Sequence, residues 1–390
     1  MDNTLVTFVD SIESVGRDDW NSLAGTSNPF TRYEFLHALE RTGCTSRESG
    51  WSPHHVVVRQ SGSNEAGRRP VAVVPLYEKN NSYGEYVFDW SWAHAYQEHG
   101  FNYYPKYVTS APFTPSVGRR LFISELLPEE EKKALIRQVF TTIQDKAEIA
   151  GASGWHVLFP TEEEHGQLAA LGLMPRIACQ FHWFNRDYES FDEFLGSLSS
   201  RKRKNIRKER SRVAEAGIQF EHVAGADIDP ALWQDFYSYY QSTYLVRGMR
   251  GYLSQEFFLE ISATMPEQIF LVRAMHEGSM IAAALFFHNE QTLFGRYWGA
   301  QADYQFLHFE TCYYQGLDYA IAHGLQEFDS GAQGEHKIQR GFEPIITYSN
   351  HWIQNTGFSG AIENFLRQEK RHILQYKQDA ASLLPFKQEA

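Results

Sequence analysis

The fold of the C-terminal half is decided by residues 268–299, which read QIFLVRAMHEGSMIAAALFFHNEQTLFGRYWG. Three apolar runs of strand length lie in this stretch, at residues 268–274, 280–288 and 292–299. The segments HEGS (276–279) and NEQ (289–291) separate them with residues typical of tight turns. The stretch therefore predicts an antiparallel meander whose middle strand is buried on both faces.

A helix and further strands follow the meander. Residues 307–323 place their apolar side chains on one stripe at helical spacing, and Gly324 is a suitable C-cap. Residues 325–329 and 347–353 are then two more strands, and residues 360–384 a long terminal helix. Antiparallel strands followed by a helix and a returning strand predict a mixed sheet of the α+β class.

The first half of the chain shows the same order in weaker form. Its predicted elements are strands at 56–59, 71–77 and 86–90 around a polar insert at 60–69, an irregular segment at 91–116, a helix at 128–150 capped by Gly151, and a strand at 154–159. In both halves a helix ends at glycine and a short apolar strand follows at once. We therefore predict two similar domains that arose by duplication, residues 1–185 and 186–390.

Composition limits the classes of protein. The 390 residues are 43% hydrophobic and 15% aromatic with a formal net charge of -12, which disfavours broad nucleic-acid binding but permits a local basic patch. Three cysteines without CxxC spacing argue against a disulfide framework and against a zinc site. No basic and apolar leader begins the sequence, and the longest apolar run, 281–287, is of strand length. These features predict a cytoplasmic, reduced protein without an integral membrane segment.

The stretch GAQGEHKIQRGF at 331–342 combines an acid, an imidazole, an amine and a guanidinium among three glycines. It follows the predicted strand that ends in Asp329. A solvated turn rarely needs this mixture, whereas a site that holds an anion and moves a proton often does. The alternative is a glycine-rich turn with scattered surface charges.

A second cluster, SSRKRKNIRKERSRV at 199–213, concentrates positive charge in an acidic chain. Leu195, Leu198, Ile206 and Val213 lie near one face at helical spacing, so the segment predicts a folded basic helix that ends at Gly217. The phosphates of a nucleotide-sugar, a coenzyme or an RNA are the partners such a helix attracts. The alternative is a solvated face that offsets acidic neighbours.

These residues resemble a known family. The basic segment at 199–210, LHFETCYY at 307–314 and GAQGEHK at 331–337 are similar to the FemAB-like group of bacterial predicted N-acyltransferases, as are FDWSWAHAY at 88–96, YYPK at 103–106 and PFTP at 112–115. The group is named after enzymes that add amino acids to peptidoglycan precursors. The resemblance covers nearly the whole chain and implies tandem GNAT-like domains.

The resemblance leaves the donor open. It implies aminoacyl-tRNA for the FemAB relatives and acyl-CoA for ordinary GNAT enzymes, with no tightly bound cofactor. Ordinary GNAT enzymes hold the pyrophosphate of coenzyme A in a glycine-containing turn. The corresponding residues 300–307, AQADYQFL, lack both glycines, which disfavours a standard coenzyme A site.

Amide formation from an activated acyl donor needs a base near the amine, stabilisation of the oxyanion and a grip on the donor. Glu335 or His336 is the predicted base, and Lys337 the group for the oxyanion or a phosphate, a role that the resemblance favours. The remaining candidates are Arg340, Asp329, His308 and Glu310 for substrate in the second domain, Asp89, His94, Tyr104 and Lys106 for the acceptor in the first, and Arg203, Lys204 and Arg207 for phosphate.

The sequence thus predicts an enzyme that transfers an acyl or aminoacyl group to an amine without a metal, in a groove between the domains. The acceptor is a cell-wall precursor, a peptide or another small metabolite. One alternative is an acyl-CoA-dependent N-acetyltransferase, and another is a binding module for a peptidoglycan precursor or peptide that has no catalytic activity. Plain core packing is the alternative for the aromatic residues Trp90, Trp92, Tyr103 and Tyr104.

Overall fold

The computed structural model describes residues 4–60, 69–246, 248–302, 304–332 and 334–387. Most of the polar insert predicted at 60–69, together with Asp303 and Gln333 of the two motif loops, lies outside these residues. The chain forms two compact units: unit 1 is Met1–Ala178 with Ile346–Leu374, and unit 2 is Cys179–Ile345 with Gln375–Ala390. The predicted domains 1–185 and 186–390 are each continuous, whereas here the chain returns to unit 1 after residue 345.

The returning segment explains this arrangement. It comprises most of strand β15 (Glu343–Ile353) and of helix α12 (Thr356–Ser382). Its apolar residues Ile353, Ile362 and Leu366 pack in one core cluster with Trp92 and Tyr96 of unit 1. Burial of this apolar surface is set by tertiary packing, which no local pattern in the sequence records.

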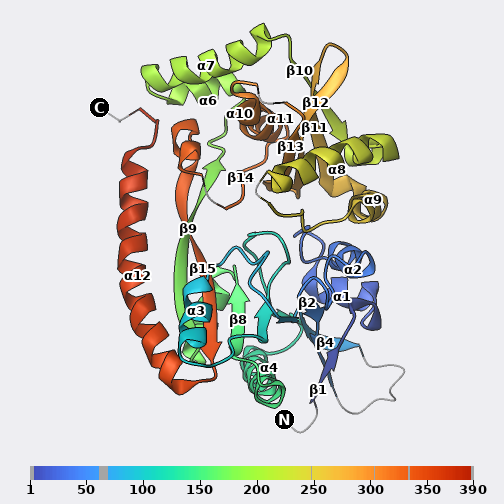
Figure 1. The fold of residues 1–390 in the computed structure, drawn as a ribbon, viewed down its shortest axis with the longest axis vertical. Helices are drawn as coiled ribbons and strands as arrows, with labels where there is room; N and C mark the ends of the chain where they lie inside the picture. The colour runs from blue at the N-terminus through green and yellow to red at the C-terminus, as the bar shows by residue number, and fades with distance from the viewer. Residues whose placement is uncertain (1–3, 61–68, 247, 303, 333, 388–390) are drawn as a thin grey trace. The chain divides into compact units, whose positions relative to one another are not determined.

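Unit 2 contains the predicted meander (Figure 1). Its strands are β10 (Gln219–Ala224), β11 (Ile269–His276), β12 (Ser279–His288), β13 (Thr292–Ala300), β14 (Glu327–Asp329) and part of β9 (Met174–Phe184), in the order β10-β11-β12-β13-β14-β9. The hairpin between β11 and β12 turns through Glu277 and Gly278, both with positive φ, as a two-residue turn between twisted strands requires. The three strands predicted at 268–299 are therefore confirmed.

Helices cover both faces of this meander. Phe286 packs in a cluster with Leu317 and Ala320 of helix α11 (Gln315–Ala322). The ring of Tyr297 contacts both Phe287 and Tyr240 of helix α8 (Pro230–Leu245). Neighbouring residues of a strand point to opposite faces, and β12 is apolar and buried on both sides from Ile281 to Phe287, as predicted.

The helix predicted at 307–323 is interrupted. It consists of α10 (Leu307–Phe309), a π-helical turn (Glu310–Tyr314) and α11, and Gly324 ends it in the left-handed conformation. A π-helical turn changes the direction in which the side chains after it point, and such turns are frequent at functional sites. Here the turn contains Glu310, a predicted substrate residue.

Unit 1 contains two groups of strands. A four-stranded sheet has the order β1-β3-β4-β7, from β1 (Thr4–Val9), β3 (His55–Gln60), β4 (Pro70–Val74) and β7 (Phe122–Ile123). The second group runs β15-β8-β6-β5-β2, from β8 (Gly154–Leu158), β6 (Lys106–Thr109), β5 (Tyr77–Lys79) and β2 (Trp51–Pro53). Strands β6 and β8 are parallel and are joined through helix α4 (Glu129–Ala150), which ends at left-handed Gly151 as predicted.

Part of the first half differs from the sequence prediction. Residues 86–90, predicted as a strand, lead instead into helix α3 (Trp90–Glu98), with Tyr86 in the left-handed conformation. The segment predicted as irregular at 91–116 therefore contains α3 and β6. The run predicted at 71–77 is two strands, β4 and β5. Many residues at 86–96 are aromatic, and a sequence of this composition is compatible with a short helix as well as with a strand.

Further α-helices complete the two units. They are α1 (Arg17–Ala24), α2 (Tyr33–Arg41), α5 (Glu162–Ala170), α6 (Phe191–Ser197), α7 (Ser200–Glu215) and α9 (Gln255–Thr264). Helix α7 is the predicted basic helix, and it buries Ile206 and Val213 as the spacing of its apolar residues requires. Within the part of the chain that the structure describes, no helix has both the length and the apolar character needed to cross a membrane.

Candidate functional site

The candidate site of unit 2 lies where the parallel strands β13 and β14 separate. Their pairing is confined to Thr292–Phe294 on β13 and Glu327–Asp329 on β14. The register of β12 with β13 shifts next to this point, between Leu285 and Phe286, and Arg296 lies in the resulting bulge of β13. A bulge of this kind re-aims a side chain, and here it directs Arg296 to the end of β14.

Arg296 and Asp329 form a buried, two-pronged ion pair at this fork. The guanidinium donates to Oδ1 at 3.1 Å and to Oδ2 at 2.5 Å, and the backbone N–H of Gly331 donates to Oδ1 at 2.8 Å. Burial alone raises the pKa of Asp329, but the charge of Arg296 outweighs it and lowers the pKa to about 2. Asp329 is therefore an anion that holds the start of the next loop.

The loop after β14 depends on its glycines. Gly331, Gly334 and Gly341 have φ values of 80°, 108° and 86°, in the region that favours glycine. A Cβ on Gly334 would also come within 2.9 Å of the imidazole of His336, so a side chain here would displace that ring. The glycines allow the loop that follows Asp329 to form a tight 3-10 turn at Glu335–Arg340.

Lys337 is the buried cation of this turn, with 2% of its surface exposed. Its Nζ donates to the backbone carbonyl oxygens of Ser330 at 3.0 Å and Gly331 at 2.9 Å. Burial lowers the pKa of Lys337 to about 8, with nearby Asp329 opposing this shift and Arg296 adding to it. Lys337 is thus a fixed ammonium group that loses its proton at a mildly alkaline pH.

His336 and Glu335, the two candidate bases, lie at the surface of the turn. The Nε2 atom of His336 is 2.9 Å from the hydroxyl of Tyr313. Burial of part of the ring and the charges of Arg340 and Lys337 lower the pKa of His336 to about 4, so the ring is neutral at pH 7. Glu335 accepts a hydrogen bond of 3.0 Å from Tyr376. His336 therefore contacts Tyr313 and Glu335 contacts Tyr376, and both side chains remain candidates for the base.

Arg340 does not lie open to a ligand. It donates to the carbonyl oxygen of His336 and to Glu209 of α7, both at 2.7 Å, and it stacks 3.4 Å from the centre of the Phe309 ring. Tyr314 also donates to Glu209. The guanidinium therefore ties the turn to helix α7, and this contact places the basic helix beside the candidate site.

The other two candidates of unit 2 lie on the helix that follows β13. The ring of His308 packs edge-on against Trp298 and Tyr313, and burial lowers its pKa to about 4. Glu310 is 3% exposed and pairs with Arg210 of α7 at 3.0 Å. The structure thus brings His308 to His336, with ring centres 6.1 Å apart, whereas Glu310 is paired with α7.

In unit 1 the structure brings three of the four candidates together. Lys106 of β6 is fully buried and pairs with Asp89 and, at 2.8 Å, with Glu85. Tyr104 is linked to the same group through Ser82, at 2.8 Å from Tyr104 and 2.9 Å from Lys106. His94 lies apart on the exposed side of α3, where it faces Glu98.

Aromatic residues surround this polar cluster. Trp92 and Tyr103 are 4% and 3% exposed and belong to the core, whereas Trp90 is 44% exposed. The hydroxyl of Tyr103 donates to Asp89 at 2.6 Å. Core packing therefore describes Trp92 and Tyr103, and Tyr103 also holds the orientation of a predicted site residue.

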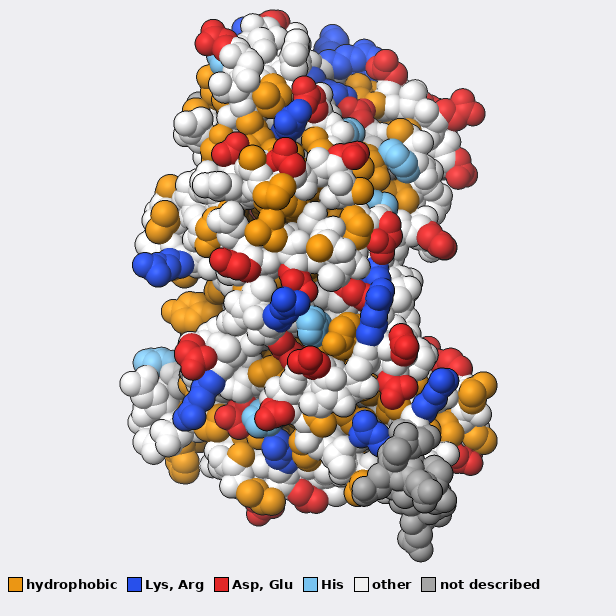
Figure 2. All heavy atoms as spheres, turned by 90° about the vertical axis from the view of Figure 1, so that its right-hand side faces the viewer, with side chains coloured by type: hydrophobic (Ala, Val, Ile, Leu, Met, Phe, Trp, Pro, Cys, Tyr) orange, Lys and Arg blue, Asp and Glu red, His pale blue; other side chains and the backbone are white. Residues whose placement is uncertain are grey.

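The candidate phosphate residues lie on α7. Arg207 pairs with Asp192 at 3.0 Å, and both side chains are exposed. Among the described residues, Arg203 and Lys204 have no acidic partner. Lys and Arg side chains gather at the top of the surface in Figure 2, the level at which Figure 1 draws α7. Helix α7 therefore presents positive charge to solvent.

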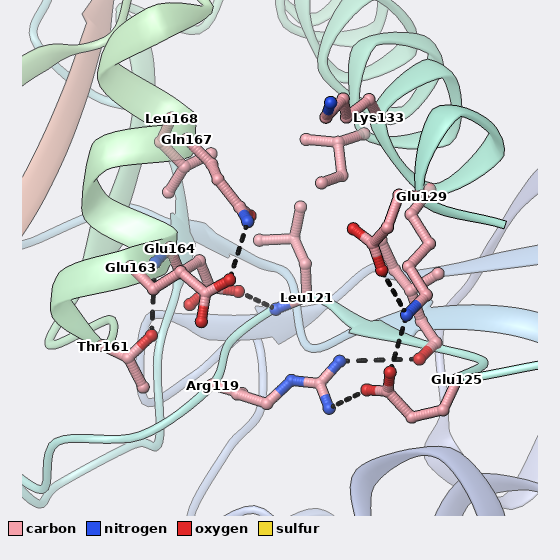
Figure 3. Close-up of a pocket in the computed structure, with 13 residues that line it drawn as sticks. Arg119, Leu121, Glu125, Glu129, Lys133, Thr161, Glu163, Glu164, Gln167 and Leu168 are labelled. Carbon is pink, nitrogen blue, oxygen red and sulfur yellow. Dashed lines mark hydrogen bonds and ion pairs between the residues drawn. The ribbon is translucent and has the colours of Figure 1, made fainter. Parts of the chain in front are cut away.

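Unit 1 has a separate small hollow between α4, α5 and β7 (Figure 3). Its volume is about 250 Å³, and its charged groups are largely satisfied by one another. The buried carboxylate of Glu164 accepts from the backbone N–H groups of Arg120 and Leu121, and Glu125 pairs with Arg119 and Lys132. This volume is below the usual range of ligand sites, roughly 300–1,000 Å³. The mutual pairing of the charged groups also leaves few of them for a ligand.

Sequence reasoning missed three residues that build the unit 2 site: Arg296, Glu209 and Tyr313. A signal existed for Arg296, because a single cation interrupts the apolar strand at 292–299. Glu209 is one acid among many cations of α7, and Tyr313 is one of many tyrosines. Only their contacts with Arg340 and His336 distinguish them.

Comparison with known proteins identifies the family. The model for FemAB-like proteins, described as peptidoglycan biosynthesis/recognition, matches residues 11–388. The chain therefore belongs to the FemAB-like family, as the sequence resemblance predicted. No curated protein matches the chain.

Solved structures share the fold at low sequence identity. FemX is 12% identical, with 92% of this chain and 100% of FemX covered and a TM-score of 0.51. A C-terminal DUF2156 domain from Agrobacterium fabrum, named for lysylphosphatidylglycerol synthetase, is 13% identical over 91% and 96% of the two chains, also with a TM-score of 0.51. A tandem GNAT protein from the clavulanic acid biosynthesis pathway is 9% identical over 90% and 99%, with a TM-score of 0.46.

The predicted fold class is confirmed. The protein is α+β, and each unit carries mostly antiparallel strands with flanking helices and one parallel strand pair joined through a helix. In unit 2 this pair is β13 and β14, and in unit 1 it is β6 and β8.

Proposed function

We propose that this protein transfers an acyl or aminoacyl group from an activated donor to an amine. The acceptor is a peptidoglycan precursor or another small amine-bearing metabolite. In the reaction the amine nitrogen attacks the acyl carbon. A C–N bond forms and the bond from the acyl carbon to the leaving oxygen or sulfur breaks. The amine gives up a proton, and the leaving group gains one.

One observation carries the proposal: the buried ammonium of Lys337 is held rigidly beside the fork of two parallel strands. Two of its donor positions are used by the carbonyls of Ser330 and Gly331, which fix the nitrogen without neutralising its charge. A fixed positive charge in a site of low polarity stabilises the oxyanion of the tetrahedral intermediate, because it needs no reorganisation as that charge develops. The anionic Asp329 holds Gly331, and through this residue it positions the carbonyl that Lys337 binds.

The neighbouring groups fit the remaining needs of the reaction. His336 is neutral at pH 7 and is positioned by Tyr313, so it can accept a proton, and exposed Glu335 is the other candidate. Arg203, Lys204 and Arg207 of α7 would attract the phosphates of the donor. Asp89, Tyr104 and Lys106 of unit 1 are the candidates for recognition of the acceptor.

The donor is either aminoacyl-tRNA or acyl-CoA. Family membership and the missing glycines at 300–307 support the first. The net charge of -12 disfavours a large RNA footprint. Binding of a precursor without transfer is the remaining alternative, and the acid, imidazole and amine placed on one turn favour catalysis over it.

The first test compares donors. Thermal shift and calorimetry with acetyl-CoA, coenzyme A and a charged-tRNA mixture would be measured on the wild type, Lys337→Ala and Arg203→Gln/Lys204→Gln. We expect stabilisation by charged tRNA, weakened in the α7 variant. A response to coenzyme A alone would replace the donor assignment. If neither donor bound, the proposal of a transferase that uses one of them would be contradicted.

The second test uses the pKa of Lys337. Acylation of a lysine-containing precursor peptide would be followed by mass spectrometry from pH 6 to 10, after subtraction of uncatalysed donor loss. The ammonium form is present below a pKa of about 8, so wild-type activity should fall as the pH rises through that value. Lys337→Arg keeps its charge over this range, and its residual activity should lack the fall. An unchanged alkaline limb in the arginine variant would rule out Lys337 as the charged group.

A further inference from the structure

A cavity of about 540 Å³ lies in unit 2 between helices α6 and α7, strand β10 and the π-helical turn. This volume is in the range of small-molecule sites, roughly 300–1,000 Å³. The buried side chains of Leu195, Val213 and Ile218 line it, and the partly buried rings of Phe191 and Phe220 add aromatic walls. The cavity can therefore hold the apolar body of a small ligand.

The charged groups at the buried end of the cavity are paired with one another. Glu310, which is 3% exposed, accepts from Gln315 at 2.8 Å and pairs with Arg210 at 3.0 Å. Arg210 also pairs with Asp318 at 2.7 Å, and its guanidinium stacks 4.5 Å from the centre of the Phe191 ring. Because these contacts hold Glu310 and Arg210 in place, neither side chain is the anchor for a charged ligand.

The exposed end of the cavity is open to a charged group. The α7 residues Arg207, Ser211 and Ala214 line the cavity there and are exposed to solvent. Arg207 pairs with Asp192 at 3.0 Å, and both side chains are more than half exposed. Water and salt screen an exposed pair of this kind, so it contributes little to stability. An incoming anion can therefore replace Asp192 at the guanidinium of Arg207.

Two further cations of α7 lie beside Arg207. Arg203 precedes it by four residues and Lys204 by three, and residues at these spacings are neighbours on the surface of a helix. Within the described part of the chain, neither of them has an acidic partner. Asp192 is the exposed acid among the described residues that line the cavity. Three cations thus lie near one exposed acid, and the local charge at this end is positive.

We infer that this cavity binds a small carboxylate with an apolar body, whose head lies at Arg207 and whose body lies between Phe191 and Phe220. A guanidinium group matches the planar carboxylate with two parallel N–H donors, and Arg203 on the preceding turn adds a second positive charge. The hydroxyl of Ser211 offers the head a further hydrogen bond. The apolar body exchanges contact with water for contact with the cavity walls.

This cavity is a second site, across helix α7 from the proposed transfer site. Glu209 of α7 contacts Arg340 of the transfer site at 2.7 Å, whereas Arg207 lines the cavity. Two residues are about half a turn of an α-helix, so these side chains point to nearly opposite sides. The candidate residues of the transfer turn do not line the cavity: Asp329, Glu335, His336, Lys337 and Arg340.

The inference goes beyond the proposed function, although the two share cations. Arg203, Lys204 and Arg207 are also the residues proposed for the phosphates of the donor. The apolar walls of the cavity have no part in that proposal. Variants of the walls therefore test the carboxylate site alone, and variants of Lys337 test the transfer reaction alone.

The first experiment uses compounds of one shape and different charge. Binding of 4-phenylbutanoate, 4-phenylbutylamine and neutral 4-phenylbutanol would be measured at pH 7 by calorimetry and ligand-observed NMR on the wild type. We expect the carboxylate to bind about ten times more tightly than the other two, the scale of one charge-assisted hydrogen bond. Equal binding of the three compounds would remove the anionic head from the inference.

Matched charge variants locate the head. Arg203→Gln/Arg207→Gln removes two charges from the cavity side of α7, and Arg201→Gln/Lys208→Gln removes two exposed charges from elsewhere on the same helix. The first variant should lower the affinity for 4-phenylbutanoate about tenfold or more, and the second should change it little. Asp192→Asn should raise this affinity, because it frees Arg207 from its exposed partner.

A matched pair of tryptophan variants locates the apolar body. Ala214 is an exposed residue of α7 that lines the cavity, and Asn205 is an exposed residue of the same helix that does not. Ala214→Trp should fill the cavity and abolish binding of 4-phenylbutanoate, whereas Asn205→Trp should leave it unchanged. Binding of charged tRNA should be the same in both variants. Circular dichroism and thermal melting would establish that all variants are folded.

Several results would overturn the inference. They are binding of none of the compounds, binding of the amine as tight as that of the carboxylate, equal losses in the two charge variants, and undiminished binding in Ala214→Trp. Loss of tRNA binding in Ala214→Trp would assign the cavity to the donor and would also overturn it. The activity of Lys337 variants enters none of these measurements.

Discussion

The two units contain the same pair of parallel strands joined through a helix, but they use it differently. In unit 1, Lys106 of β6 belongs to a buried group with Lys79 of β5, Glu85 and Asp89. In unit 2, the pair β13 and β14 separates, and Arg296 with Asp329 occupies the fork. The buried charges of unit 1 mainly hold each other, whereas those of unit 2 position a glycine-rich turn with exposed acid and base groups.

The difference follows from what comes after the second strand. In unit 1, strand β8 continues through Phe159 and Pro160 into helix α5, so the chain after it is used for structure. In unit 2, strand β14 ends in a turn that glycines alone can form, and this turn carries Lys337 and His336. The two units thus share this strand–helix–strand arrangement, and they differ in the loop that follows it.

The largest effect is expected from removal of one buried cation in each unit. Lys106→Met leaves Asp89 and Glu85 buried without their nearest cation, which should destabilise unit 1 by about 3–5 kcal/mol. Arg296→Met should cost less, because Asp329 keeps the N–H of Gly331 and lies 3.6 Å from His182. Hydrogen exchange resolved by unit would measure both changes, and a larger loss in Arg296→Met would reverse the comparison.

A smaller effect concerns activity rather than stability. Lys337→Met should lower the rate of transfer about 100-fold or more, the usual result of removing one group that stabilises an oxyanion. Thermal melting should change little compared with Lys106→Met. The rates would be compared under saturating donor, with Lys208→Met on the solvent face of α7 as a control. Full activity in Lys337→Met would move the chemistry to another group.

Next comes the response of unit 1 to acid. His156 and His351 are buried with their Nδ1 atoms 2.8 Å apart, and burial lowers the pKa of both, that of His156 to about 3. A depressed histidine pKa means that the unfolded chain binds the extra proton first. Stability is therefore complete above about pH 6.5 and is lost as the pH falls toward 3.

For His156 alone this loss is about 2 kcal/mol at pH 5 relative to pH 7, on the scale of 1.36 kcal/mol per pKa unit. Urea unfolding followed from pH 7 to pH 5 would measure it, with His156→Gln/His351→Gln as the comparison. A wild type that is equally stable at both values would show that these histidines bind no additional proton on unfolding.

The smallest effect is expected in the stability of variants at two buried glutamates, each of which lines a hollow. Glu164 in unit 1 accepts two backbone N–H groups, whereas Glu310 in unit 2 has an oxygen without a partner. Glu164→Gln should therefore cost about 1 kcal/mol, the usual value of one hydrogen bond. Glu310→Gln should be neutral or slightly stabilising, because it removes a surplus charge. Melting temperatures of the two variants, measured side by side, would show the opposite order if this account were wrong.

The comparison also shows where sequence reasoning succeeded. The meander at 268–299, the basic helix and the helix that ends at Gly151 were predicted because their apolar spacing and their glycines are local signals. The prediction for residues 86–96 was wrong, because their aromatic side chains are compatible with a strand, an irregular segment or a short helix. The sequence did not predict that β15 and α12 return to unit 1, because only distant apolar contacts specify this return. The contacts of Ile362 and Leu366 with Trp92 are examples.

By itself, the sequence determined the class of fold, the family resemblance and the turn on which acid, imidazole and amine stand together. These features depend on periodicity, glycine positions and short motifs, which are local. Only the tertiary structure decided that Arg296 pairs with Asp329, that Arg340 is tied to Glu209 and that Glu310 faces a cavity with an unpartnered oxygen. Those facts depend on which distant side chains share a buried space, and the balance of charge there is a property of the packed protein alone.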